Sequence, residues 1–179
     1  MATVSRSFFR RPVVRVAAAV VAGLLVVAVA LLEPWNLFID QRVSEPVPAV
    51  SADAGAPSPA PVVLARGELI GHEHTTTGSV QVLGMPDGSR VLRLQDLQTS
   101  NGPLLKVWIT DAPVLPGTDG WSVFDDGSYV DLGELKGNIG SSNYPLPADV
   151  DLSRLTSVSV WCDRFNVSFG AAQLAPAGG

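Results

Sequence analysis

The chain has 179 residues, a length that suits one globular domain with additional segments. Its net charge is −5 and is unevenly spread: four of the twelve basic residues precede residue 16, whereas all seventeen acidic residues follow residue 32. The acidic remainder repels phosphate, so we predict no nucleic-acid partner. A single cysteine excludes a disulfide within the chain and any zinc or iron–sulfur site built from several cysteines.

An apolar block near the N-terminus explains why the mean hydropathy of the chain, +0.27, is high for a soluble protein. Residues 16–32 are seventeen consecutive uncharged residues, nearly all alanine, valine and leucine. They predict a transmembrane helix over residues 13–33, in which Arg15 extends its guanidinium to the lipid headgroups. The preceding arginines predict that residues 1–12 form a cytoplasmic basic tail. We therefore expect a single-pass cell-membrane protein that contacts the lipid bilayer through residues 13–33 and is extracytoplasmic beyond them.

A cleaved signal peptide is the alternative interpretation of this block, with residues 28–30 as a cleavage site of the A-x-A type. Leu31 and Leu32 continue the apolar run where a signal peptide becomes polar, which favours an uncleaved anchor. Trp35 and Phe38 follow, where aromatic residues commonly lie at the membrane interface. The sequence favours the anchor and leaves its cleavage open.

Residues 34–66 form the predicted extracytoplasmic linker. From residue 40 to residue 66 no hydrophobic periodicity is present, and five prolines are interleaved with alanine, serine and valine. This composition is typical of a disordered or polyproline-II-like spacer. At the other end of the chain, residues 175–179 are predicted to be a disordered tail.

The body, residues 67–174, has apolar side chains at alternate positions. In residues 105–109, for example, Lys106 and Trp108 alternate with aliphatic side chains. The same alternation recurs in residues 92–95, 157–162 and 165–169. Turns rich in glycine, proline, asparagine and aspartate separate these segments. The pattern predicts an all-β fold, a compact sandwich or barrel of about 7–10 short and mostly antiparallel strands, preceded by the transmembrane helix and the linker.

Cys162 is the main candidate for chemistry. By alternation it shares a face with Val158 and Val160, which predicts a small hydrophobic side chain with an inert thiol in the core. It also ends its strand, and an unpaired thiol outside the cytoplasm meets oxidants unless it is shielded or used. Arg164 would lower the thiol pKa and Asp163 would raise it, so the structural and redox interpretations both stay open.

His72 and His74 are the chain's two histidines, and at i and i+2 on a strand they would share one face. Such a pair can bind a metal ion if a third ligand lies close, and Glu68 or Cys162 could supply it. The simpler interpretation is a solvated pair at the end of a strand, so we expect no metal site. The sequence contains no hydrolase motif and no phosphate-binding glycine loop followed by a helix.

Three elements in the C-terminal part are specific in combination. Residues 131–140 read DLGELKGNIG, residues 143–147 read NYPLP, and residues 161–170 read WCDRFNVSFG. With the earlier Asn101-Gly102-Pro103 turn, they make the body resemble the DM-thirteen domain, a proposed electron-transfer domain of animal and bacterial surface proteins. The chain departs from the family pattern at Leu104, Lys106 and Ser141-Ser142, and keeps it at Cys162.

This resemblance implies an extracytoplasmic β-domain in which Cys162 works in redox chemistry, as a bare thiol or by holding a prosthetic group such as haem. In the haem case, Trp161 and the face of Phe165 and Phe169 would line the pocket. We rank the bare thiol first, because a body filled by its own side chains has little room for a porphyrin. Covalent haem attachment is excluded, because no C-x-x-C-H motif is present.

The functional expectation is therefore a membrane-tethered domain that takes part in electron transfer or thiol redox with an unidentified redox or cell-surface partner. The alternative is a redox-silent binding or structural module in which Cys162 only packs in the core. Both describe an electron-transfer or binding module more readily than a turnover enzyme.

Overall fold

A computed structural model describes residues 12–32, 34–35, 39–49 and 60–178 of the chain. The chain divides into two units, residues 1–35 and 36–179, which we describe separately. Most of the expected cytoplasmic tail, and Phe38 of the expected interfacial aromatics, lie outside the described residues. Trp35 is described and exposed.

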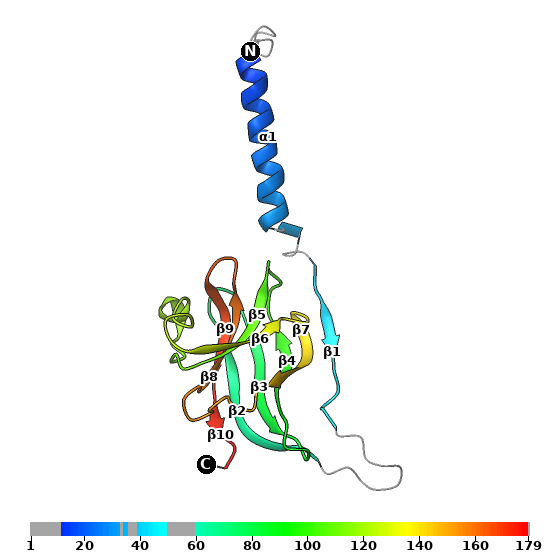
Figure 1. Ribbon diagram of the computed structural model, residues 1–179, viewed down its shortest axis with the longest axis vertical. Coiled ribbons are helices and arrows are strands. Elements are labelled where there is room, and N and C mark those ends of the chain that lie inside the picture. Colours follow the sequence, from blue (N-terminus) through cyan, green and yellow to red (C-terminus); the bar gives the residue numbers. More distant parts are fainter. Residues whose placement is uncertain (1–11, 33, 36–38, 50–59, 179) are drawn as a thin grey trace. The chain divides into compact units, whose positions relative to one another are not determined.

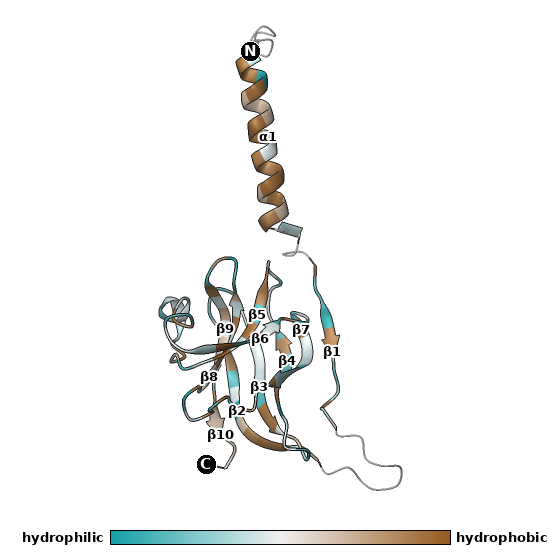
Figure 2. Ribbon diagram, viewed as in Figure 1, coloured by the Kyte–Doolittle hydropathy of each residue, from teal (hydrophilic) through white to brown (hydrophobic). Residues whose placement is uncertain are grey.

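The first unit contains the helix α1, Pro12–Leu32, which begins with a proline at a position where the missing N–H costs no hydrogen bond. Its 21 residues give a length of roughly 30 Å, enough to cross the hydrocarbon core of a bilayer. None of its residues is buried by the protein, and Figure 2 shows apolar residues all around it. By length and composition, α1 is a helix that could span a membrane.

The second unit is a curled sheet of ten strands (Figure 1). The strand order is β1-β7-β4-β3-β2-β9-β8-β5-β6, and β10 also pairs with β2. The strands are β1 (Arg42–Ser44), β2 (Val62–Gly71), β3 (Thr77–Gly84), β4 (Arg90–Gln98), β5 (Leu105–Thr110), β6 (Tyr129–Glu134), β7 (Ile139–Leu146), β8 (Ser157–Cys162), β9 (Val167–Gln173) and β10 (Ala175–Pro176). The β1–β7 pair is parallel and the other pairs are antiparallel, so the predicted all-β fold is confirmed.

The main core forms because alternating apolar side chains of neighbouring strands are in register. Val80 lies opposite Leu94 in the β3–β4 pair, and Val107 lies opposite Val160 in the β5–β8 pair. All four side chains are fully buried. Since residues two apart on a strand share a face, each strand contributes several such side chains to one interior.

Strand β8 is buried on both faces, which alternation alone did not predict. On its outer face, Trp161 packs with Trp108 and with Phe124 of the segment 111–128, which includes the short 3₁₀ helix η3 (Gly117–Gly120). The hydroxyl of Ser157, on the same face, donates a hydrogen bond of 2.7 Å to the carbonyl of Ala112. The segment 111–128 is thus a cover over the outer face of β5 and β8, and we call it the cover segment.

The described parts of the expected spacer and tail include paired backbone. Residues 42–44 form β1, and β2 already begins at Val62. Ala175 and Pro176 pair with Arg66 and Ala65, where a disordered tail was expected. The expectation failed here because these short strands are stabilised by partners far away in the sequence and carry no alternation of their own. Residues 50–59 of the spacer lie outside the described residues.

We predict that Phe124→Ala lowers the free energy of unfolding by about 3–5 kcal/mol, because it removes a fully buried ring from the contact between the cover segment and β8. Urea denaturation followed by tryptophan fluorescence measures this loss. Phe165→Ala is the matched control, since its ring is 55% exposed and should cost less than about 1 kcal/mol. Equal losses at the two positions would contradict the covering role.

Candidate functional site

Cys162 is the last residue of β8, where Leu105 of β5 and Val167 of β9 lie opposite it. Its side chain is fully buried in the main core. The Sγ–H group donates a hydrogen bond of 3.3 Å to the carbonyl of Pro103, in the turn before β5. The thiol is therefore enclosed between two core strands and one loop carbonyl.

Burial raises the pKa of the Cys162 thiol above its ordinary value of 9.0. The backbone N–H groups of Phe165 and Arg164 oppose this shift, while the negative charges of Glu73 and Asp163 add to it. The expected lowering by the Arg164 side chain is not among the causes, so desolvation decides the direction. The resting thiol is protonated at neutral pH and is a weak nucleophile.

A mostly apolar pocket of about 480 Å³ lies beside this thiol. Pro103, which accepts the Sγ–H bond, and Val167, which lies opposite Cys162, both line it. The other lining residues are Glu73, His74, Gly102, Trp121, Phe165 and Phe169. Cys162 does not line the pocket itself, so loop and strand residues, Pro103 and Val167 among them, separate Sγ from it.

The two histidines do not share a strand face, which corrects the expectation for this pair. Both lie in a bend after β2 ends at Gly71. His72 Nε2 donates to the carbonyl of Leu115 at 3.0 Å, and its Nδ1 lies 2.8 Å from the hydroxyl of Ser168. Burial lowers the pKa of His72, so the neutral ring connects the cover segment to β9.

His74 instead lies on the pocket wall, where its Nε2 lies 2.5 Å from a carboxylate oxygen of Glu73 and its ring packs against Phe169 at a centroid distance of 4.0 Å. Glu68, the other proposed metal ligand, is an exposed residue of β2. Within the described ranges, no group of three or more His, Cys, Asp or Glu side chains is placed to hold a metal ion.

A family model described as electron transfer DM13 matches residues 68–174, which is more than half of the chain and includes Cys162 and the whole pocket lining. The chain belongs to the DM13 family. No curated protein and no solved structure matches it. The resemblance inferred from the sequence motifs is therefore confirmed, and the family supports a role of the electron-transfer type.

The residues of this DM13 domain do not fit a haem ligated by Cys162. A thiolate ligand needs a deprotonated sulfur that faces an open pocket, whereas Sγ is enclosed and bonded to the Pro103 carbonyl. Trp161 lies away from Phe165 and Phe169, on the outer face of β8, where it stacks on Trp108 at 4.9 Å. Trp161 and Phe169 thus belong to separate core clusters, and Phe165 lies exposed in the turn between β8 and β9.

Sequence reasoning missed several residues of this DM13 site. Glu73 and Trp121 line the pocket although neither belongs to an alternating strand. The Asn101-Gly102-Pro103 turn was recognised as a family element, and its contact with Sγ explains its place in the site. A ring stack from Trp161 through Trp108 to the partly exposed Tyr129, with centroid distances of 4.9 and 4.1 Å, was also missed.

We predict that the stability difference between the wild type and Cys162→Ala depends on pH. Below the ordinary thiol pKa of 9.0, both folded and unfolded states keep the proton, and the difference is constant. Above it, the unfolded state loses the proton first, so the wild type loses up to about 1.4 kcal/mol of its advantage per pH unit until the raised folded pKa is reached. Urea unfolding of both proteins between pH 7 and 10.5 measures this. A difference that stays flat or rises would contradict the raised pKa.

Proposed function

We propose that this DM13 domain exchanges electrons through the thiol of Cys162 while α1 holds it at a membrane. The observation that carries the proposal is the position of the chain's single thiol, next to the pocket but separated from it by Pro103 and Val167. A thiol in this position is protected from adventitious oxidants at rest and needs only a local movement to meet a reagent.

The backbone on both sides of the sulfur supports such a movement. Leu104, after the Pro103 turn, has φ +60°, and Asn166, in the turn between β8 and β9, has φ +50°. Non-glycine residues in this region carry a local conformational cost of about 1–3 kcal/mol. The Asp163 N–H donates to the Leu104 carbonyl at 3.1 Å, so the two turns would open together.

In the open state, the Cys162 thiol would lose its proton to solvent and attack a disulfide of a redox partner. One sulfur–sulfur bond forms between Cys162 and the partner, and the partner's second sulfur leaves as a thiolate. An external thiol then attacks the Cys162 sulfur of this mixed disulfide, so the partner leaves as a dithiol and Cys162 is bonded to the external sulfur. A second external thiol displaces Cys162 as a thiolate, so the partner gains two electrons and the two external thiols leave as one disulfide. The proposal requires no second cysteine in this chain.

A redox-silent module is the second candidate function, and the full burial of Cys162 favours it. In that case Sγ contributes only its packing and its bond to the Pro103 carbonyl. The domain would then bind a cell-surface partner through other residues. The two candidates differ in one measurable property, the way in which Sγ becomes accessible.

We predict that Cys162 in the folded full-length chain reacts with a small uncharged thiol reagent through local opening. Labelling should therefore be at least about tenfold faster than global unfolding allows, and insensitive to low urea concentrations. Mass spectrometry measures the labelling rate, and urea denaturation gives the rate limit set by global unfolding.

Val160→Cys in a Cys162→Ala background is the matched control, because Val160 is also fully buried on the same face of β8 but does not border the pocket. This cysteine should react only through global unfolding. Equal rates at positions 160 and 162 would support the redox-silent module and reject the proposed function of Cys162.

For the membrane tether, we propose that α1 spans the cell membrane with residues 1–12 in the cytoplasm and the domain outside. We predict that Gly23→Arg releases most of the chain from the membrane fraction, since a charge at mid-helix costs about 2.5–3.5 kcal/mol. A Cβ at Gly23 meets no atom within 4 Å, so steric effects are small, and Gly23→Leu is the control that should stay bound. Immunoblotting of membrane and soluble fractions reads the outcome. A wild-type chain shortened by cleavage after Ala30 would contradict the anchor.

A further inference from the structure

Strand β1 is added to the sheet from outside the family domain. Its residues pair in parallel with β7, with Val43 opposite Gly140 and Ser44 opposite Ser141. The DM13 match begins at residue 68, so β1 lies outside it and β7 lies inside. An extended segment therefore occupies an edge that belongs to the domain, in the manner of a bound peptide strand.

The backbone of this segment is bound at both ends of β1. The Ile139 N–H donates to the Gln41 carbonyl at 3.2 Å, and the Glu45 N–H donates to the Ser141 carbonyl at 2.9 Å. Asn138, which is 1% exposed, accepts the Gln41 N–H with its Oδ1 at 2.7 Å. The amide of Asn138 also donates to an Asp40 carboxylate oxygen at 3.1 Å. Backbone contacts of this kind bind any extended chain.

Two glycines make room for the segment. A Cβ on Gly140 would lie 1.9 Å from the Val43 carbonyl oxygen, and one on Gly137 would lie 2.6 Å from the Gln41 carbonyl oxygen. Gly140 also has φ +112°, a backbone conformation that other residues rarely adopt. Both glycines lie within the DM13 match, so the matched region makes room in this chain for a strand that lies outside the match.

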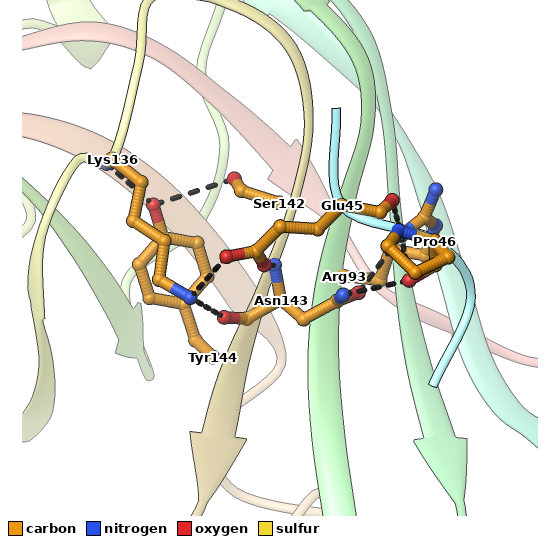
Figure 3. Close-up of polar contacts among 7 residues, drawn as sticks. All are labelled: Glu45, Pro46, Arg93, Lys136, Ser142, Asn143 and Tyr144. Atoms are coloured by element: carbon orange, nitrogen blue, oxygen red, sulfur yellow. Dashed lines mark hydrogen bonds and ion pairs between the residues drawn. The ribbon is translucent and has the colours of Figure 1, made fainter. Parts of the chain in front are cut away.

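The carboxylate of Glu45 is bound by a lysine side chain and a backbone N–H of the domain (Figure 3). Its carboxylate accepts hydrogen bonds from Lys136 Nζ at 2.8 Å and from the Asn143 N–H at 2.6 Å. The bond to Lys136 is the largest cause that lowers the pKa of Glu45. The guanidinium of Arg93, only 6% exposed, donates to the carbonyls of Glu45 and Pro46 at 3.1 and 3.3 Å.

We propose that the β7 edge is a strand-acceptor site for an extended acidic peptide, and that the chain fills this site with its own residues 39–48. The backbone contacts supply affinity, and the carboxylate position at Glu45 supplies specificity. This binding site stands apart from the pocket beside Cys162 and does not depend on the proposed redox function.

The test uses a fluorescent peptide of residues 39–48 and the full-length chain in detergent micelles. In the wild type, the tethered segment competes at an effective concentration of order millimolar, so the peptide should bind weakly. Gln41→Pro with Glu45→Ala removes one backbone donor and the carboxylate from the tethered segment only. The peptide should bind this double variant at least about tenfold more tightly than the wild type, as measured by fluorescence anisotropy.

Two controls address the specificity of the site. A peptide with alanine in place of the glutamate should bind the double variant about tenfold more weakly, and adding Lys136→Ala to the double variant should weaken the native peptide similarly. Lys106→Ala is the matched control. Lys106 lies on β5, far from β7 in the strand order, and pairs with Asp131, so its replacement should not change the affinity for the peptide. Equal affinities for the two peptides, or no peptide binding to the folded double variant, would overturn the proposal.

Hydrogen exchange on an otherwise wild-type chain gives a second measurement if the double variant does not fold. Lys136→Ala should speed exchange at the Glu45 and Asn143 amides about tenfold and leave the fully buried Val160 of β8 unchanged. Unchanged exchange at all three amides would overturn the site. Light scattering tests whether residues 39–48 pair with β7 of the same chain. A wild-type dimer in which these residues pair with β7 of the other copy would overturn that assignment.

Discussion

The burial of β8 on both faces is the constraint on which the rest of this domain depends. A strand that carries Val158 and Val160 on one side and Trp161 on the other must be covered twice, by the opposite strands and by the cover segment. His72 then connects that segment to β9 through the carbonyl of Leu115. The position of Cys162 follows directly, because the last residue of a doubly covered strand is enclosed even though a turn begins next to it.

This enclosure determines what redox chemistry at Cys162, as proposed above, would require. A surface thiol would be activated by nearby cations, whereas here desolvation and two carboxylates raise the thiol pKa. The chemistry proposed for Cys162 would therefore be controlled by access, and the turns at Pro103 and Asn166 would determine when the sulfur meets solvent or a partner. In that proposal, the adjoining pocket would hold an incoming group once those turns move.

The sequence predicted those parts of the fold that have a local signal. Alternation in residues 105–109 and 157–162 located β5 and β8, and the combined motifs identified the DM13 domain. The three residues of β1 had no such signal, because its partners lie almost one hundred positions away in the chain. The sequence also did not reveal the bend that contains His72 and His74, because the spacing i and i+2 occurs both in strands and in bends. The sequence located Cys162 but not the wall and pocket beside it, which are formed by residues from separate loops and strands.

The short strand β1 also affects how the protein behaves at high concentration. Without it, β7 would present a row of unpaired backbone groups that can template the sheet of another molecule. With it, the outermost strand is only three residues long. It is followed by Pro46 and Pro48, which have no backbone N–H that could pair with a strand of another molecule. The same segment that occupies the acceptor edge therefore protects this edge of the sheet against aggregation.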